Sequence, residues 1–320
     1  MAPANEGDNR HKPILLVALG GNALIRKGQQ GTIEEQFENL RVPISQIARL
    51  TRDYRIIITH GNGPQVGNLL LQQECCDDVP KMPLEILVAQ TQGAIGYMIE
   101  STLDSELMRQ GIATIKPLVS LISYVVVDEN SQAFRNPTKP IGPAFSQEKA
   151  AMLPYTTRKT DKGFRRVVAS PEPVTIVEKN EIMRLIEMDF VVICCGGGGI
   201  PVVREGRSFA GVDAVIDKDL ASAKLASEVG VDTFIIATDV KGVAINYERE
   251  NQQFLRTLTL EMARQYEGQR QFSEGAMLPK VLAATAFLRS GGRRAVITSI
   301  EAIEDAVAGR AGTEVLRDSR

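Results

Sequence analysis

The sequence is poor in the side chains that build metal centres and disulfide frameworks: its 320 residues include two histidines, four cysteines and no tryptophan. With only His11 and His60 available, a centre of several histidine ligands is excluded. The cysteines form two adjacent pairs, Cys75-Cys76 and Cys194-Cys195, which match neither a secreted disulfide framework nor the C-x-x-C spacing of zinc and redox sites. This cysteine usage predicts a reducing, cytoplasmic compartment.

Long apolar stretches and a strong net charge are also missing. No apolar run reaches the roughly 18 residues that a membrane span needs. Basic residues 10–12 precede an apolar segment, as in a signal peptide, but Gly20-Gly21-Asn22 interrupts that segment and no small-residue cleavage site follows. The 37 Lys and Arg residues nearly balance the 39 Asp and Glu residues, which argues against nucleic-acid binding through overall charge. We therefore expect a soluble protein with no membrane or nucleic-acid partner, in which any anion site is local.

What the sequence does have is an alternation of short, β-branched apolar runs with longer amphipathic stretches. Continuously apolar strands separated by helices are typical of a parallel sheet that is covered on both faces. We expect a flexible tail over residues 1–13, followed by one α/β domain over residues 14–320. The runs typical of strands are residues 14–19, 55–59, 190–195, 233–238 and 294–298, and those typical of helices are residues 33–51, 64–76, 219–229 and 281–289.

Residues 125–170 break this alternation. They include the proline-rich stretch 136–143 and the basic, polar run 158–163. We interpret them as a small, hairpin-bearing lobe that protrudes from the sheet. A long surface insertion without a role is the alternative that the pattern leaves open.

Glycine-rich turns follow three of the expected strands. A glycine directly after a parallel strand lets the backbone turn sharply with free N–H groups, and the positive end of a following helix adds to the attraction for phosphate. In an open α/β sheet such turns lie at the carboxyl ends of the strands, where ligands bind. One such turn is often only a steric requirement, but three can converge on one crevice. The turns are Gly20-Gly21-Asn22, His60-Gly61-Asn62-Gly63-Pro64 and Gly196-Gly197-Gly198-Gly199.

Two common phosphate-binding motifs are excluded. The sequence contains no Gly-Lys dipeptide, so it has no P-loop. Residues 61–67 fit G-x-G-x-x-x-G, but they follow the second strand and contain Pro64, and the glycines after the first strand lack the spacing of a dinucleotide-binding fold. Lysines outside these motifs must therefore meet the phosphates of any bound nucleotide.

Three lysines are placed where they could do so. Lys218 stands beside Asp219 at an expected helix start, and Lys280 follows Pro279, which we expect at a first helical position. Cations at helix N-termini oppose the helix dipole, so an anion such as phosphate is needed to compensate. Lys139 lies in a turn made rigid by prolines. Taken singly, Lys218 and Lys139 are more simply explained as exposed surface lysines.

Five motifs together resemble the carbamate kinases of the amino-acid-kinase superfamily. The similarity extends from about Ile14 to the C-terminus, and the second and third motifs are the most specific, since other superfamily members share only a glycine-rich first turn. The motifs are Ala18-Leu19-Gly20-Gly21-Asn22-Ala23, His60-Gly61-Asn62-Gly63-Pro64-Gln65-Val66-Gly67-Asn68, Asn136-Pro137-Thr138-Lys139-Pro140-Ile141-Gly142-Pro143, residues 196–202 and Ala214-Val215-Ile216-Asp217-Lys218-Asp219.

The resemblance implies a three-layer αβα sandwich with a central, mostly parallel sheet, a small protruding subdomain and a homodimer. It also implies reversible phosphoryl transfer between carbamoyl phosphate and ADP, giving ATP and carbamate, which decomposes to ammonia and CO2. Mg2+ would arrive on the phosphates of ATP or ADP, without protein ligands that the sequence identifies.

The resemblance also assigns roles to matching residues. The catalytic set is Lys139, Lys218, Asp219 and Lys280, with Asp219 orienting the lysines. Residues that would bind phosphate and the carbamate end are Gly20, Gly21, Asn22, Gly61, Asn62, Gly63, Gly196 and Gly197. Residues that would bind the nucleotide are Thr238, Asp239, Tyr247, Met277 and Lys280.

The sequence departs from the family pattern at Ala276, where a serine is common, and at the unusual pair Cys194-Cys195. Two alternatives stay open: another small-acid or nucleotide kinase of the same superfamily, and a nucleotide-binding sensor without catalysis. A dehydrogenase ranks last. We expect His60 to shape its turn and not to transfer protons, because the attacking atom in this chemistry is already an anion.

Overall fold

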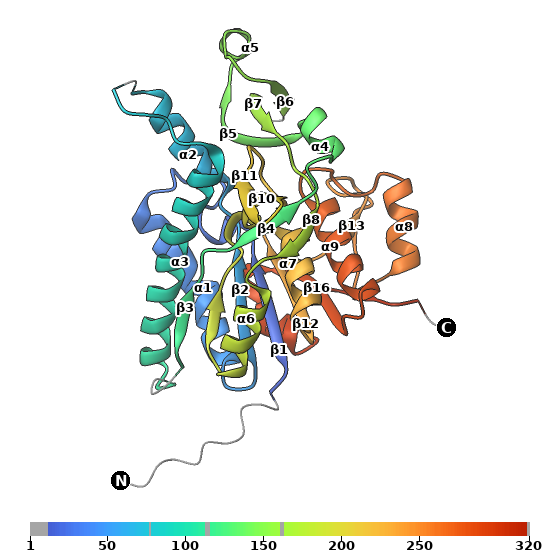
Figure 1. The fold of residues 1–320 in the computed structure, drawn as a ribbon. Helices are drawn as coiled ribbons and strands as arrows, with labels where there is room; N and C mark the ends of the chain where they lie inside the picture. Colours follow the sequence, from blue (N-terminus) through green and yellow to red (C-terminus); the bar gives the residue numbers. More distant parts are fainter. Residues whose placement is uncertain (1–11, 77, 113–115, 161–162, 319–320) are drawn as a thin grey trace.

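A computed structural model describes residues 12–318 except 77, 113–115 and 161–162. Its centre is an eight-stranded sheet in the order β15-β17-β16-β12-β1-β2-β9-β3 (Figure 1). The six strands from β16 to β3 run parallel, whereas β17 is antiparallel to β16 and parallel to β15. The mostly parallel sheet predicted from the sequence is thus confirmed. The predicted tail lies outside the described residues up to residue 11.

The strands of this sheet are β1 (Ile14–Leu19), β2 (Arg55–His60), β3 (Leu118–Ser120), β9 (Val191–Ile193), β12 (Thr233–Thr238), β15 (Thr257–Thr259), β16 (Arg294–Ser299) and β17 (Thr313–Leu316). The helices around it are α1 (Ile33–Leu50), α2 (Gly63–Glu74), α3 (Leu84–Arg109), α6 (Lys179–Glu187), α7 (Lys218–Glu228), α8 (Leu260–Gly268), α9 (Met277–Arg289) and α10 (Ile303–Val307). No helix in the described part of the chain has the length and apolar character needed to cross a bilayer.

The two faces of β1 show how the helices are layered. Leu15 and Val17 are buried in a core shared with α1, α3 and α10, whereas Leu16 and Ala18 are buried in a core shared with α6, α7 and α9. Successive side chains of a strand point to opposite faces, so a strand that is apolar throughout must be covered on both sides. The αβα sandwich expected from the sequence is confirmed.

Two smaller sheets stand above the carboxyl ends of the central strands (Figure 1). The first has the order β11-β10-β4-β8, and the second is the antiparallel sheet β5-β7-β6. The second, with two short helices, is called here the three-stranded lobe. The elements of the first sheet are β4 (Tyr124–Val127), β8 (Pro173–Ile176), β10 (Ile200–Glu205) and β11 (Ser208–Gly211). Those of the lobe are α4 (Gln132–Arg135), β5 (Lys139–Phe145), α5 (Gln147–Ala150), β6 (Thr157–Thr160) and β7 (Gly163–Val168).

The start of α9 differs from the sequence-based expectation. The helix begins at Met277, so Pro279 is its third residue and the prediction of a first-position proline was wrong. The N–H groups of Met277 and Leu278 donate to Oγ and the carbonyl oxygen of Ser273, at 3.2 and 3.0 Å, and these bonds turn the chain into the helix before the proline. A proline in the first turn removes no intrahelical hydrogen bond, because those N–H groups have no acceptor within the helix.

Candidate active site

The three glycine-rich turns lie side by side at the carboxyl ends of neighbouring strands. The N–H of Gly20 donates to the carbonyl oxygen of Ala237 at the end of β12 (2.9 Å). The N–H of Gly61 donates to the carbonyl oxygen of Leu19 (3.0 Å). A Cβ on Gly61 would lie 3.3 Å from the backbone nitrogen of Gly21. The backbones of the first two turns are therefore in contact, and only residues without large side chains fit between them.

The third turn packs against the side chains of the second. A Cβ on Gly197 would lie 2.1 Å from Nδ2 of Asn62, and a Cβ on Gly196 would lie 2.4 Å from Nε2 of His60. Gly197 also has a φ of +66°, a left-handed conformation that glycine adopts at low cost. Space thus requires glycine at both positions, and backbone conformation also favours it at Gly197. The predicted phosphate-binding residues of all three turns meet at one place.

Asn62 and His60 are held rigidly in this arrangement. Nδ2 of the buried Asn62 donates to Oγ1 of Thr91 on α3 (2.8 Å). Burial lowers the pKa of His60 from 6.5 to about 4, and the charge of Lys218 acts in the same direction. His60 is therefore neutral near pH 7, and its Nδ1 donates to the carbonyl oxygen of Gly61 at 3.1 Å. Its bond to Gly61 lies within the turn, and the expectation that His60 does not transfer protons stays a prediction.

The start of α7 brings charged groups to the same place. Asp217 is the N-cap: its Oδ1 accepts hydrogen bonds from the N–H groups of Asp219 (2.9 Å) and Leu220 (3.4 Å). Lys218 and Asp219 are the first two residues of the helix. A Cβ on Gly198 would lie 2.4 Å from the carbonyl oxygen of Ile216, so the third glycine turn runs directly beside the segment that leads into α7.

Lys218 and Lys280 converge on the carboxylate of Asp219. Nζ of Lys218 is 2.7 Å from Oδ1, and Nζ of Lys280 is 2.9 Å from Oδ2. Asp219 is the one carboxylate at ion-pair distance from the buried Lys218 ammonium among the described residues. An ammonium carries three N–H donors, so an anion between the two lysines would accept from the donors that Asp219 does not use.

Burial and charge act against each other on these three groups. Burial lowers the pKa of Lys218 in spite of Asp219. Burial alone would raise the pKa of Asp219, but the charges of Lys218 and Lys280 outweigh it and hold that pKa below its usual range. Burial opposes the charge of Lys280, yet Asp219 raises its pKa. Asp219 is therefore ionised near neutral pH and cannot serve as a proton donor.

Lys139 reaches the same region from the three-stranded lobe. It is the first residue of β5, and its Nζ lies 2.6 Å from Oδ2 of Asp217. Its side chain is 31% exposed, compared with 10% for Lys218 and 14% for Lys280. Lys139 is thus the outermost of the three ammonium groups.

The predicted nucleotide-binding residues are less closely grouped. Thr238 ends β12, and its Oγ1 donates to Oδ1 of Asp239 (3.1 Å). The charge of Asp239 also contributes to the raised pKa of Lys280, so these residues are near the lysines. Met277 packs on the core under α7 and α9. Tyr247 is 47% exposed and shares no hydrogen bond with the others in the described chain.

Sequence reasoning missed two residues that organise the site. Asp217 belongs to one of the five motifs that carry the family resemblance, but the sequence alone does not indicate its role. Gln92, on α3, donates from Nε2 to the carbonyl oxygens of Gly196 (3.1 Å) and Ser123 (3.2 Å) and so fixes the third glycine turn. The only signal for Gln92 in the sequence is a pair of amides within an otherwise apolar helical stretch, and the signal for Asp217 is a good capping residue directly before a helix.

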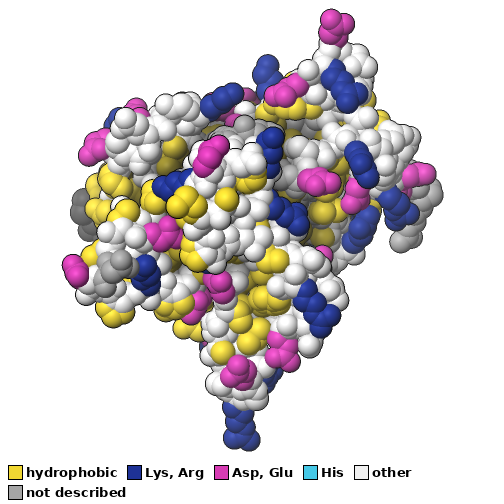
Figure 2. Space-filling view, turned by 90° about the horizontal axis from the view of Figure 1, so that it is seen from above, with side chains coloured by type: hydrophobic (Ala, Val, Ile, Leu, Met, Phe, Trp, Pro, Cys, Tyr) yellow, Lys and Arg dark blue, Asp and Glu magenta, His cyan; other side chains and the backbone are white. Residues whose placement is uncertain are grey.

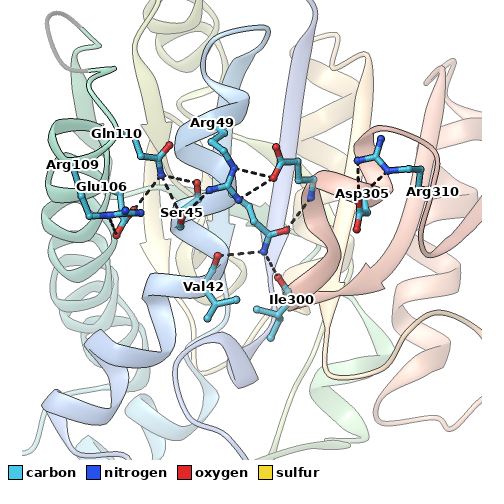
Figure 3. Close-up of polar contacts among 11 residues, drawn as sticks. Val42, Ser45, Arg49, Glu106, Arg109, Gln110, Ile300, Asp305 and Arg310 are labelled. Atoms are coloured by element: carbon cyan, nitrogen blue, oxygen red, sulfur yellow. Dashed lines mark hydrogen bonds and ion pairs between the residues drawn. The ribbon is translucent and has the colours of Figure 1, made fainter.

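A second concave region, with a volume of about 460 Å3, lies between α1, α3 and α10 and is lined by none of these residues (Figure 3). Its charged side chains pair with one another: Arg49 with Glu304 at 2.9 Å and Arg109 with Glu106 at 2.6 Å. We call it the helical groove.

Basic and acidic side chains are likewise interspersed over the face of the molecule seen from above in Figure 2. Neither surface concentrates charge of one sign.

Comparison with known proteins agrees with this geometry. The model of the amino acid kinase family matches residues 13–299. The carbamate kinase of Thermococcus kodakarensis is 46% identical to this chain, and the match covers 95% of this chain and 99% of that protein. The carbamate kinase of Pyrococcus furiosus is 45% identical, and the match covers 94% of this chain and 98% of that protein. The solved carbamate kinase from Giardia lamblia bound to AMP-PNP superimposes with a TM-score of 0.89 at 36% identity, over 97% of this chain and 100% of that one.

These similarities confirm the resemblance seen in the sequence motifs, and they extend over nearly the whole chain and its fold. The chain therefore belongs to the amino acid kinase family and, within it, to the carbamate kinases, which are phosphotransferases.

Proposed function

We propose that the chain catalyses reversible phosphoryl transfer between carbamoyl phosphate and ADP, giving ATP and carbamate. The observation that carries this proposal is the buried group formed by Lys218, Asp219 and Lys280 at the meeting point of the glycine turns. It combines two buried ammonium groups that share one carboxylate with turns that present backbone N–H groups.

The residues suffice for this chemistry without a general base. In either direction the attacking atom is already an anion, a carbamate oxygen or a phosphate oxygen of ADP, so no proton has to leave. Catalysis then depends on alignment and on neutralising the charge of a loose phosphoryl transition state. His60, with its pKa of about 4, and Asp219, with its low pKa, keep fixed protonation states through the reaction near neutral pH.

Each part of the site has a proposed task. The turn Gly20-Gly21-Asn22 binds the transferred phosphoryl group, the turn Gly61-Asn62-Gly63 binds the carbamate end, and Gly196 and Gly197 complete the phosphate-binding surface. Lys218 and Lys280 neutralise the transferring phosphoryl oxygens, and Lys139 approaches the substrate from the lobe. The residues proposed to hold the nucleotide are Thr238, Asp239, Tyr247, Met277 and Lys280.

Mg2+ is proposed to enter with the nucleotide. No group of three or more His, Cys, Asp or Glu side chains able to hold a metal is found in the described residues, and the carboxylates of Asp217 and Asp219 contact lysines. This donor set fits a hard cation that is held mainly by phosphate oxygens and water. When bound, the ion would neutralise part of the phosphate charge.

Three further assignments belong to the same proposal. Residues 14–320 form one domain, with a protruding subdomain at roughly 125–170. The protein is a homodimer, supported by apolar side chains that α3 leaves 44%, 65% and 60% exposed at Ile86, Tyr97 and Met108. It is cytoplasmic, supported by four free cysteines.

A coupled assay of ATP formation from carbamoyl phosphate and ADP tests the proposed reaction. We expect turnover with carbamoyl phosphate and none with acetylglutamate or uridylate as acceptor in the reverse direction. Turnover only with a larger acceptor would assign another kinase activity of the family. ADP binding without turnover of any of these substrates would assign a nucleotide sensor. Either result would overturn the proposal.

A further inference from the structure

The ion pair between Lys139 and Asp217 joins two parts of the molecule that are far apart in the sequence. Lys139 begins β5 of the three-stranded lobe, and Asp217 caps α7 in the central sandwich. Their Nζ and Oδ2 atoms are 2.6 Å apart, across 78 residues of sequence. The pair thus ties the lobe to the helix that carries Lys218 and Asp219.

Asp217 uses its two carboxylate oxygens for different tasks. Oδ1 accepts from the N–H groups at the start of α7, while Oδ2 accepts from Lys139. One side chain therefore fixes both the helix that presents Lys218 and the ammonium that comes from the lobe. Because an asparagine caps a helix about as well as an aspartate, the two tasks can be separated by mutation.

Other contacts seat the lobe without directing Lys139. A Cβ on Gly67 of α2 would lie 2.5 Å from Cα of Gly142, so α2 and β5 touch backbone to backbone. Arg166 on β7 and Asp213 form a longer ion pair of 3.7 Å at the same junction, and the Asp213 side chain is 65% exposed. This longer pair, in which the Arg166 side chain is 21% exposed, provides a control for Lys139 and Asp217, whose side chains are 31% and 13% exposed.

We propose that Asp217 is a positioning residue: it holds Lys139 at the phosphate site before substrate binds, and Lys139 moves onto the phosphoryl oxygens when they arrive. The inference rests on the proposed function for the identity of that substrate. Lys139 pairs with Asp217, while Lys218 and Lys280 share Asp219. An incoming phosphate is a stronger partner for the partly exposed Lys139 than a carboxylate that also caps a helix.

Kinetics of Asp217→Asn, Lys139→Met and the double variant test the proposal. We expect Asp217→Asn to lower kcat/KM for carbamoyl phosphate about fivefold, the size expected for a partly exposed ion pair. The double variant should be no worse than Lys139→Met alone, and Asp213→Asn should match the wild type. Asp217→Ser, which also keeps a capping oxygen, should behave like Asp217→Asn. Wild-type or raised kcat/KM in Asp217→Asn, or additive losses in the double variant, would contradict the proposal.

Hydrogen exchange of the β5 and β7 amides provides a readout that does not need catalysis. We expect these amides to exchange faster in Asp217→Asn and in Lys139→Met than in the wild type. The double variant should exchange at the same rate as the single variants, and Asp213→Asn should exchange at the wild-type rate. Unchanged exchange in Asp217→Asn would overturn the positioning role even in an active carbamate kinase. Conversely, a wild-type protein without carbamate kinase activity but with this exchange pattern would overturn the proposed function and leave the positioning role standing.

Discussion

The candidate active site at the carboxyl ends of the strands and the helical groove both contain charged side chains, but they balance charge differently. In the candidate active site, Lys139 pairs with Asp217, whereas the buried Lys218 and Lys280 share the carboxylate of Asp219, with Asp239 near Lys280. In the helical groove, Arg49 and Arg109 each have a carboxylate at ion-pair distance. Two buried ammonium groups that share one carboxylate favour an anionic ligand, whereas charges paired one to one at a surface do not.

The largest expected effect comes from removing one of the two buried ammonium groups. Lys218→Met and Lys280→Met should each lower kcat for ATP formation about 10²- to 10³-fold, if each lysine contributes like a typical oxyanion-hole donor. Methionine keeps most of the length of the side chain, so the circular dichroism spectrum should not change. Steady-state assays measure the effect. Near-wild-type turnover in both variants would show that the buried lysines contribute no more to function than the paired charges of the helical groove do.

The next effect concerns the glycine-rich backbone of the candidate active site. Gly197→Ala should destabilise the protein by about 2–5 kcal/mol and impair turnover, because it combines a left-handed conformation with overlap against Asn62. Gly230→Ala is the matched control: Gly230 has a similar φ, +69°, but no atom within 4 Å of its added Cβ. It should cost only about 1–2 kcal/mol from the conformation alone. Thermal unfolding separates the two, and equal losses would contradict the steric account.

A third prediction uses the buried His60. Its folded-state pKa of about 4 lies below the ordinary 6.5, so the unfolded state binds the proton more tightly. The free energy of unfolding should therefore fall between pH 6.5 and 4, by at most about 3 kcal/mol. Above pH 6.5 this contribution is fully present. His60→Asn should lose this slope in denaturant titrations across that range.

The same histidine should leave no mark on the activity profile near neutral pH. If kcat for the wild type followed a bell-shaped pH profile that His60→Asn abolished, His60 would be a proton-transfer residue and the base-free account would be wrong.

The smallest effect is expected in the helical groove. Arg49→Met should change stability by no more than about 1 kcal/mol, since its pair with Glu304 is about 40% exposed on both sides. Turnover should stay at the wild-type level. A tenfold loss of kcat in this variant would show that the groove takes part in function.

The central sheet could be predicted from the sequence because its strands are marked locally. Ile14–Leu19 and Thr233–Thr238 were predicted with the observed bounds, since each is a continuous apolar run that turns or polar residues delimit. The start of α9 was not predicted, because hydrogen bonds from Met277 and Leu278 to Ser273, and not the proline, begin the helix.

The site was accessible to sequence reasoning only in part. Glycines after strands, and lysines beside helix starts, are local signals that indicate where phosphate can bind. The part played by Asp217 depends on a contact with Lys139 across 78 residues, and that of Gln92 on bonds to Ser123 and Gly196. Such long-range pairings carry no periodicity or spacing in the sequence, so only the folded structure reveals them.

A crystal structure of the chain with AMP-PNP tests the central claim most directly. The account predicts Nζ of both Lys218 and Lys280 within about 3 Å of phosphate oxygens, beside the glycine turns. A bound nucleotide whose phosphates lie elsewhere, with both ammonium groups still occupied only by Asp219 or turned toward bulk water, would contradict it.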